Sequence, residues 1–318
     1  IKENMLTEEQ KAIFDKEHEL DYTYSLSGVG RFRINFFRQR NSDSLVIQRV
    51  ILKIKSLEEL DLPPMLGDLV LKDRGLILVV GATGSGKSTT LAAMVDHRNT
   101  HCSGHILTLE DPVEFLHTHK KSIVNQREIG QDSNSYQRAL KSALREAPSM
   151  LLIGEIRDKP TMTSALNFAE TGHLVLSTLH ATNAPQTIER ILSFYEPSQY
   201  DMVKLQISQN LESIIAQRLV MTLDGGRIAV MEILLSTARV RDLICKGDIE
   251  LLHNTIESSS VEGMQLFDQS LYQLFMDKKI SEETAIFYAD RPSDFKLRVQ
   301  LQTKQMFTQK IELLGESE

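Results

Sequence analysis

The chain has 318 residues, of which 41% are apolar and 25% charged, the composition of an ordinary globular protein. Its longest strongly apolar stretch, Gly75 to Val80, is far shorter than the ~20 residues of a membrane-spanning helix, so an integral membrane protein is excluded. The 36 Lys and Arg against 43 Asp and Glu give a net charge of −7, which argues against a general nucleic-acid-binding surface. We therefore expect a soluble protein with no nucleic-acid partner.

The two cysteines, Cys102 and Cys245, belong to no CxxC or Cys/His cluster, so the sequence predicts neither a disulfide framework nor a zinc site. A reducing, cytoplasmic location fits this pattern best. The first residue is Ile1 rather than Met, and we expect the native N-terminus to lie upstream of it.

The N-terminal segment combines a helix signal with a strand signal. Thr7 to Gln10 has the spacing of a capping box and predicts a short amphipathic helix. Tyr22 to Ser27 and Arg31 to Phe36 alternate polar and apolar residues, which is typical of a hairpin with one buried face. Arg31 and Arg33 would then share the open face of that hairpin.

A Pro-Pro pair within Leu60 to Pro64 is the best linker candidate, so we expect domains at 1–63 and 64–318. Beyond it, short apolar runs alternate with helix-length segments, which implies βαβ units and a mainly parallel sheet. The runs and segments are Leu76–Val80, Lys87–His97, His105–Leu109, Leu151–Ile153, Thr161–Thr171, Leu174–Ser177 and Ala184–Leu192. From Tyr200 onward we expect mostly helix, with one further strand at Arg227 to Leu235.

Gly81 to Ser88 matches the phosphate-loop pattern G-x-x-x-x-G-K-[ST], and it follows an expected strand and opens an expected helix, as the motif requires. Glycines let backbone N–H groups converge on phosphate oxygens at a positive helix terminus. Lys87 would meet the β- and γ-phosphates, and Ser88 would ligate Mg²⁺. The candidate nucleotide-binding residues are Thr83, Gly84, Ser85, Gly86, Lys87, Ser88 and Thr89.

Carboxylates follow two of the expected strands. Glu110 and Asp111 end the strand His105 to Leu109, with Glu114 three residues further on, and Glu155 ends the strand Leu151 to Ile153. The carboxyl ends of parallel strands open toward one crevice, so we expect these groups near the phosphate loop. An alternative role for each is that of a cap or a solvated loop residue.

Three segments, Leu107 to Phe115, Leu152 to Asp158 and Ala169 to His180, resemble the aspartate, Walker B and histidine boxes of the secretion ATPase superfamily. The chain is most similar to the type IV pilus retraction ATPases of the PilT/PilU family, from about Gly28 to about Leu301. The resemblance implies an α/β fold: a RecA-like P-loop NTPase domain, a small α+β, PAS-like N-terminal domain that is incomplete at its start, and a helical C-terminal part.

The resemblance also implies roles for individual residues. Glu114 would be the general base that orients the attacking water, and Glu155 the Walker B carboxylate acting on Mg²⁺. Gly154 stands where many other P-loop enzymes have an Asp, a substitution that is usual in the family. His173 and His180 match the histidine box, with γ-phosphate sensing and loop support as equal alternatives.

Phosphoryl transfer needs cations that offset charge in the transition state, and a neighbouring subunit can supply them. In the family the N-terminal domain carries such arginines, and Arg31, Arg33, Arg38 and Arg40 match that basic stretch. The alternative is a solvated basic strand face. Sites shared between chains would require an oligomer, which the resemblance implies is a homo-hexamer.

The C-terminal third is more similar to the PilU branch than to the PilT branch, notably at Gly263 to Leu271 and Ala289 to Arg298. The four-cysteine metal set common in pilus assembly ATPases is absent from the sequence. The resemblance therefore implies hydrolysis of Mg-ATP that powers pilus retraction and twitching motility. The implied partners are a PilT-like ATPase and an inner-membrane pilus platform protein, at the cytoplasmic face of the inner membrane.

Two other functions stay open. The chain could bind ATP and support a PilT motor while hydrolysing little itself. It could instead be a RecA-like nucleic-acid translocase, although the net negative charge and the lack of an aromatic-rich basic groove weigh against this.

Overall fold

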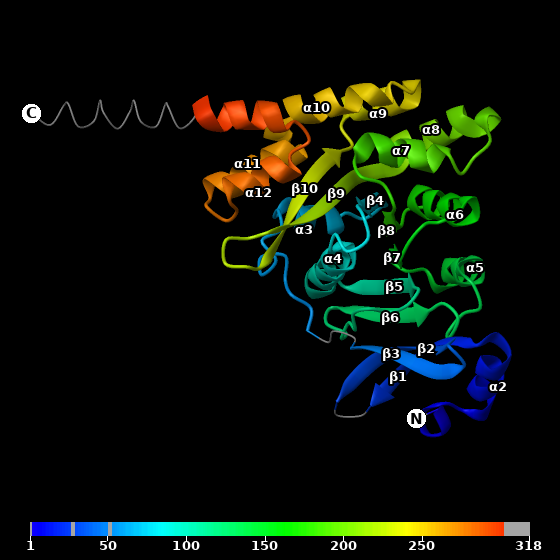
Figure 1. Cartoon of the computed structure of the whole chain (residues 1–318). Coiled ribbons are helices and arrows are strands. Elements are labelled where there is room, and N and C mark those ends of the chain that lie inside the picture. Colours follow the sequence, from blue (N-terminus) through cyan, green and yellow to red (C-terminus); the bar gives the residue numbers. More distant parts are fainter. Residues whose placement is uncertain (1, 27–28, 50–52, 302–318) are drawn as a thin grey trace, which may run out of the picture. The chain divides into compact units, whose positions relative to one another are not determined.

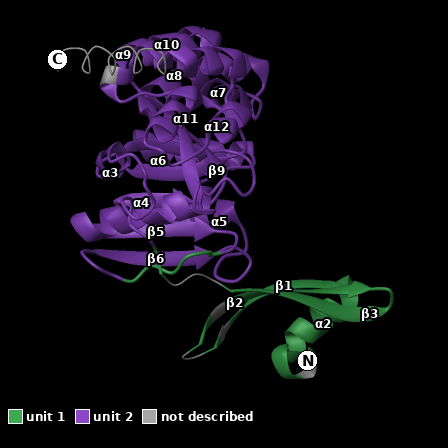
Figure 2. Cartoon of the chain, turned by 60° about the vertical axis from the view of Figure 1, so that its left-hand side comes forward, with its two compact units in different colours: residues 1–54, 113–118 green, residues 55–112, 119–318 purple. Residues whose placement is uncertain are grey.

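The computed structural model describes residues 2–26, 29–49 and 53–301. Contacts within the chain define two compact units, coloured separately in Figure 2. The smaller comprises Ile1–Ile54 and Val113–Thr118, and the larger comprises Lys55–Pro112 and His119–Glu318. Residues 55–63, expected in the N-terminal domain, thus group with the larger unit. Across the described ranges, no helix is long and apolar enough to cross a membrane.

The smaller unit packs two helices beside a three-stranded antiparallel sheet of order β1-β2-β3. The elements are α1 (Lys2–Met5), α2 (Glu8–Glu17), β1 (Glu19–Leu26), β2 (Gly30–Gln39) and β3 (Ser42–Arg49). The predicted capping box is confirmed: Thr7 Oγ1 accepts from the backbone N–H of Gln10 at 3.3 Å, and the backbone N–H of Thr7 donates to Gln10 Oε1 at 3.0 Å. The predicted hairpin is confirmed as β1 and β2.

Side chains of β2 alternate between the core and the open face. Ile34 and Phe36 are buried together with Phe14 of α2. Arg33 and Asn35 lie on the opposite face, because successive strand residues point to opposite sides. The small sheet therefore presents polar groups on the face away from its core.

The larger unit is built on a seven-stranded sheet of order β10-β9-β4-β8-β7-β5-β6, parallel except for β10. The strands are β4 (Gly75–Val80), β5 (Gly104–Glu110), β6 (Ser122–Glu128), β7 (Met150–Ile153), β8 (Leu174–Leu179), β9 (Leu211–Met221) and β10 (Arg227–Leu235). The predicted α/β class with a mainly parallel sheet is thereby confirmed.

Helices cover both faces of this sheet (Figure 1). The helices before β9 are α3 (Met65–Val70), α4 (Lys87–His101), α5 (Tyr136–Glu146), α6 (Lys159–Glu170), α7 (Ala184–Leu192) and α8 (Tyr200–Asn210). Ile77 and Val79 of β4 pack toward α3 and α4, whereas Leu76, Leu78 and Val80 face α5, α6, α7 and α8. Because β4 is buried on both faces, its sequence is continuously apolar.

A group of helices follows the sheet: α9 (Ala238–Lys246), α10 (Leu252–Ser258), α11 (Phe267–Met276) and α12 (Glu282–Tyr288), and residues 292–301 are also helical. The expected helical C-terminal part and the strand at Arg227 to Leu235 are confirmed. The expectation of mostly helix from Tyr200 onward holds for α8 but is wrong for Leu211–Met221, which is β9. Its mixed run, Leu-Glu-Ser-Ile-Ile-Ala-Gln-Arg, is buried between β4 and β10, and this long-range pairing overrides local helix propensity.

Glu232 of β10 is a carboxyl group inside the core, only 2% exposed. Its Oε1 accepts from the backbone N–H of Ala184, the first residue of α7, at 2.7 Å. Burial raises the pKa of Glu232 to about 7, and the nearby Asp290 carboxylate adds to this, while the Ala184 hydrogen bond and Arg218 act in the opposite direction. The folded chain therefore holds this proton at pH values where the unfolded chain has released it.

Stability of the larger unit is predicted to fall as the pH rises from about 4.5 to about 7, because over this range the unfolded chain releases the Glu232 proton while the folded chain keeps it. Glu232→Gln keeps an acceptor for the Ala184 N–H and removes the titration. In urea unfolding, we expect the variant to match the wild type at pH 5 and to be more stable by about 3 kcal/mol at pH 8. An equal difference between the two proteins at both pH values would contradict this.

Candidate nucleotide-binding site

The phosphate loop occupies the turn between β4 and α4, at the carboxyl end of a central strand. Gly84 and Gly86 adopt left-handed φ values of 79° and 89°. A Cβ on Gly81 would lie 2.4 Å from the Gln217 carbonyl oxygen, and one on Gly86 would lie 2.8 Å from Gln217 Nε2. The loop glycines are thus required both by backbone conformation and by close packing against β9.

The loop concentrates hydrogen-bond donors. Lys87 Nζ donates to the carbonyl oxygens of Gly81 and Ala82, each at 2.9 Å, so its ammonium group lies over the loop. Ser85 Oγ is buried and has no hydrogen-bond partner in the described part of the chain. The first N–H groups of α4 lack intrahelical acceptors, and Ser88 is exposed in this first turn. Such an arrangement of donors can bind phosphate oxygens.

Gln217 of β9 holds the loop from the neighbouring strand. Its Nε2 donates to the Ser85 carbonyl oxygen at 2.8 Å, and its Oε1 accepts from Thr90 Oγ1 of α4 at 2.7 Å. The side chain is buried, at 2% exposure. Sequence reasoning missed this residue because β9 was expected to be helical, although a Gln inside an apolar run is a signal for a buried polar contact.

The ends of β7 and β8 meet next to one another. Glu155, which follows β7, is 15% exposed and forms an ion pair with Arg157. Its second carboxylate oxygen lies 3.4 Å from Nε2 of His180, which follows β8. The hydrogen bond to Glu155 raises the pKa of Arg157. The structure thus brings Glu155 and His180 together, at the sheet edge where β4 enters the phosphate loop.

Close packing explains why position 154 is a glycine. A Cβ at this position would lie 3.2 Å from Tyr136 Oη and 3.3 Å from both Glu110 Cα and the Leu109 carbonyl oxygen. An Asp here, as in many other P-loop enzymes, would press on two backbone atoms that cannot move aside easily. Any carboxylate near the phosphate loop must therefore come from a residue other than position 154.

Tyr136, at the start of α5, was not predicted as a site residue. Its hydroxyl is buried without a hydrogen-bond partner among the described residues. Burial raises its pKa, and the carboxylates of Asp111, Glu155 and Glu110 raise it further. Tyr136 therefore stays protonated and can donate a hydrogen bond to an acidic neighbour or to a bound water.

Glu110 and Glu114 are two further carboxylates that were predicted for the site. Glu110 Oε1 accepts from Thr108 Oγ1 at 2.6 Å and Gln126 Nε2 at 3.1 Å, so this group is held within the sheet. Glu114 is exposed and belongs to Val113–Thr118, the segment that groups with the smaller unit. Its predicted role as general base stays a prediction.

His173 is placed away from the phosphate loop. It precedes β8, and its carbonyl oxygen accepts from the backbone N–H of Gly75 at the amino end of β4. Its ring packs edge-on against Phe168, at 5.3 Å between centroids. The six residues of β8, at about 3.3 Å each, separate it from His180, so the two histidines lie about 20 Å apart. Within one chain, the structure supports the loop-holding role for His173.

The predicted arginines lie in the smaller unit. Arg33 is half-buried on β2, and Arg40 is exposed in the β2–β3 turn. Arg38 Nε donates to Asp43 Oδ1 at 2.9 Å, and its guanidinium lies 5.5 Å from the Phe14 ring centroid. The side chain of Arg31 lies outside the described set. A role for these arginines at another chain's nucleotide remains a prediction.

A pocket of about 290 Å³ opens beside the first turn of α4, on the side of β9 and β10. Its lining residues are Leu60, Leu62, Gly86, Thr89, Thr90, Gln217, Leu219, Arg227 and Ala229. Glu155 and His180 lie on the opposite side of β4, because β8 and β7 follow it in the sheet. The loop thus has carboxylate and imidazole groups on one side and, on the other, a pocket lined by both apolar and polar side chains.

This geometry defines a P-loop nucleotide-binding protein with a RecA-like sheet. The family model for type II/IV secretion system proteins matches residues 46–273. The type IV pilus ATPase PilU of Pseudomonas aeruginosa is 47% identical over 93% of this chain and 78% of its own length. PilT of the same organism is 40% identical over 92% of this chain and 85% of its own. A crystal structure of the pilus retraction motor PilT with bound ADP superposes with a TM-score of 0.85, at 39% identity, covering 92% of this chain and 83% of that one.

The chain belongs to the type II/IV secretion system protein family, and it is a nucleotide-binding ATPase of that family. The family and fold predicted from the four motifs are confirmed. Identity to PilU exceeds identity to PilT, in agreement with the features of the C-terminal third.

Replacing Lys87 with Ala is predicted to weaken ADP binding about 100-fold, because the loop loses its one charged donor to the β-phosphate. Titration of a fluorescent ADP analogue measures this. Lys296→Ala, at an exposed position among residues 292–301, is the matched control and should bind like the wild type. Equal affinity of the Lys87 variant and the control would contradict the assignment of the loop.

Proposed function

We propose that the chain is a cytoplasmic ATPase that hydrolyses Mg-ATP to power type IV pilus retraction and twitching motility, as a PilU-like motor. The observation that carries the proposal is the phosphate loop with Glu155 and His180 beside it, in a chain 47% identical to a PilU protein. The fold positions these groups at the ends of neighbouring strands, β4, β7 and β8.

ATP would bind with its phosphates over Gly81–Ser88. Lys87 would exchange its contacts to the Gly81 and Ala82 carbonyls for contacts to the β- and γ-phosphates. The backbone N–H groups in the first turn of α4 would donate hydrogen bonds to phosphate oxygens. The apolar side chains Leu60, Leu62 and Leu219 would cover the adenosine end, because their pocket lies on the side of the loop away from Glu155.

Mg²⁺ fits this site. Among the described residues, no group of three His, Cys, Asp or Glu side chains could hold a metal ion alone. Mg²⁺ needs no such group, because it is usually bound by one or two protein oxygens together with phosphates and water. Ser88 would supply its hydroxyl, and Glu155 would bind water on the ion. The ion would neutralise charge on the phosphate oxygens.

Hydrolysis would need an oriented water and further positive charge. Glu114 is proposed as the general base and His180 as a contact to the γ-phosphate. Arginines of a neighbouring smaller unit, from Arg31, Arg33, Arg38 and Arg40, would offset the charge that develops in the transition state. Because the site would be shared between chains, activity would require a ring of identical subunits, which we propose is a homo-hexamer.

The further partners are proposed from the relatives. A PilT-like ATPase would act alongside this ring, and an inner-membrane platform protein of the pilus would receive its motion at the cytoplasmic face of that membrane. The names of two relatives, a type IV pilus ATPase and a pilus retraction ATPase, support this assignment.

Steady-state ATP hydrolysis across a range of protein concentrations tests the proposal. We expect a specific rate that rises with protein concentration, because sites form between chains. Glu114→Gln should lower the rate by about 10²- to 10⁴-fold with nucleotide affinity retained, because it removes a general base. Glu283→Gln, on α12, is the matched control with an unchanged rate.

A wild-type rate no higher than that of Glu114→Gln at every concentration would overturn the motor assignment. That result would favour the accessory role, in which the chain binds nucleotide and supports a PilT-like motor. Stimulation of the rate by DNA would favour the translocase.

A further inference from the structure

Strand β9 contacts the phosphate loop on one face and the C-terminal helices on the other. Gln217 and Arg218 are consecutive, so their side chains leave the strand in opposite directions. Gln217 reaches Ser85 and Thr90, as described above. Arg218 reaches the last residue of α12, the segment after it and the first residue of α11.

The side-chain amide of Gln217 has a forced orientation. A carbonyl oxygen only accepts hydrogen bonds, so the amide NH₂ group must face Ser85 and the amide oxygen must face the Thr90 hydroxyl. Both ends of the amide are satisfied, which a buried polar group requires. The Ser85 carbonyl therefore has a fixed position, and Ser85 lies in the middle of the loop that would receive phosphates.

Arg218 fixes the opposite face of β9. Its Nη1 donates to the Tyr288 carbonyl oxygen at 3.1 Å, its Nη2 lies 2.8 Å from Asp290 Oδ1, and its guanidinium lies 3.8 Å from the Phe267 ring centroid. A planar guanidinium that stacks on a ring and binds a carboxylate is a well-ordered contact. The chain after α12 is thus attached to the strand that carries Gln217.

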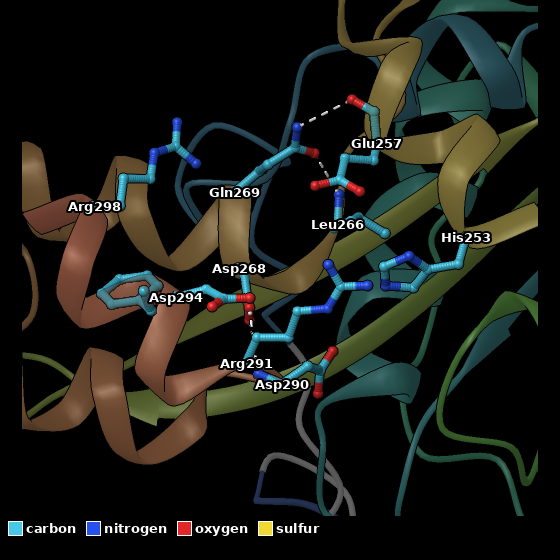
Figure 3. Close-up of a pocket in the computed structure, with 10 residues that line it drawn as sticks. His253, Glu257, Leu266, Asp268, Gln269, Asp290, Arg291, Asp294 and Arg298 are labelled. Atoms are coloured by element: carbon cyan, nitrogen blue, oxygen red, sulfur yellow. Dashed lines mark hydrogen bonds between the residues drawn. The ribbon is translucent and has the colours of Figure 1, made fainter.

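Asp290 is itself held by α11. Figure 3 shows Asp290, Arg291 and Asp268 together at one side of the pocket between α10, α11 and residues 292–301. Asp268 accepts from the backbone N–H groups of Asp290 at 2.7 Å and Arg291 at 3.0 Å. The contacts therefore form a continuous chain: Asp268, Asp290, Arg218, Gln217 and the phosphate loop.

We propose that Gln217 is a positioning residue for the phosphate loop, and that the C-terminal helices set the nucleotide affinity of the loop through Arg218 and β9. The inference rests on the proposed nucleotide site. A displacement of β9 moves Gln217 with it, and the Ser85 carbonyl then loses its donor. Because leaving a buried polar group unpaired is unfavourable, the loop would respond to small movements of the strand.

Gln217→Glu tests the first part, with a pH dependence that a purely structural role would not give. At pH 8 the new carboxylate still accepts from Thr90 but faces the Ser85 carbonyl as a second acceptor. At pH 6 the buried carboxyl binds a proton and can donate to Ser85 again. We expect the ratio of ADP dissociation constants, variant to wild type, to be about 10 to 100 at pH 8 and to fall toward 1 at pH 6.

Gln265→Glu is the matched control. Gln265 Nε2 also donates to a backbone carbonyl, that of Met231 on β10, at 3.1 Å, but Gln265 does not contact the phosphate loop. Its affinity ratio should stay near 1 at both pH values. If Gln217→Glu does not fold, Thr90→Val removes the second contact of Gln217 and should weaken ADP binding about 3- to 10-fold.

A double-mutant cycle tests the second part. Arg218→Gln and Asp290→Asn break the same ion pair from its two sides. Each should weaken ADP binding about 3- to 10-fold in the wild-type background and have little further effect in the Gln217→Glu background.

Independent effects of positions 217 and 218, or an unchanged affinity in Arg218→Gln, would overturn the coupling. An unchanged ratio for Gln217→Glu at pH 8 would overturn the positioning role. Failure of the wild type to bind ADP would instead overturn the proposed function.

Discussion

The arrangement of the site depends on one constraint, the burial of β4 on both faces between β8 and β9. Helices cover both sides of this strand, and the turn from its carboxyl end into α4 is the phosphate loop. The same parallel pairing brings the ends of β7 and β8, with Glu155 and His180, to that edge. The opposite neighbour, β9, supplies Gln217 beneath the loop.

Close packing around the loop decides which residue types are tolerated. Gly81 and Gly86 lie against Gln217, and Gly154 lies against Tyr136 and two backbone atoms. Space, rather than backbone conformation, therefore accounts for the glycine that stands in place of a Walker B aspartate. The buried groups near this region, Tyr136 and Glu232, have raised pKa values because burial disfavours their charged forms.

Local motifs were predictable, and long-range contacts were not. The phosphate loop, the strand that precedes it and the helix that follows form one continuous segment, so their pattern is visible in the sequence. Gln217 is separated from Ser85 by more than a hundred residues and becomes a site residue only through the β4–β9 pairing. The burial of Tyr136 and Glu232 also depends on long-range packing, so the sequence alone did not reveal it. His173 shows the converse: its position in a motif predicted a shared site, but β8 separates it from His180.

The central claim is that the loop seats the β-phosphate of a nucleotide, and calorimetric titration of the wild-type chain with ADP and with AMP tests it most directly. The structure predicts one ADP per chain and at least about 100-fold weaker binding of AMP, because Lys87 and the N–H groups of the loop would have no β-phosphate to contact. Equal affinities for ADP and AMP, or an ADP affinity that Lys87→Ala leaves unchanged, would contradict it.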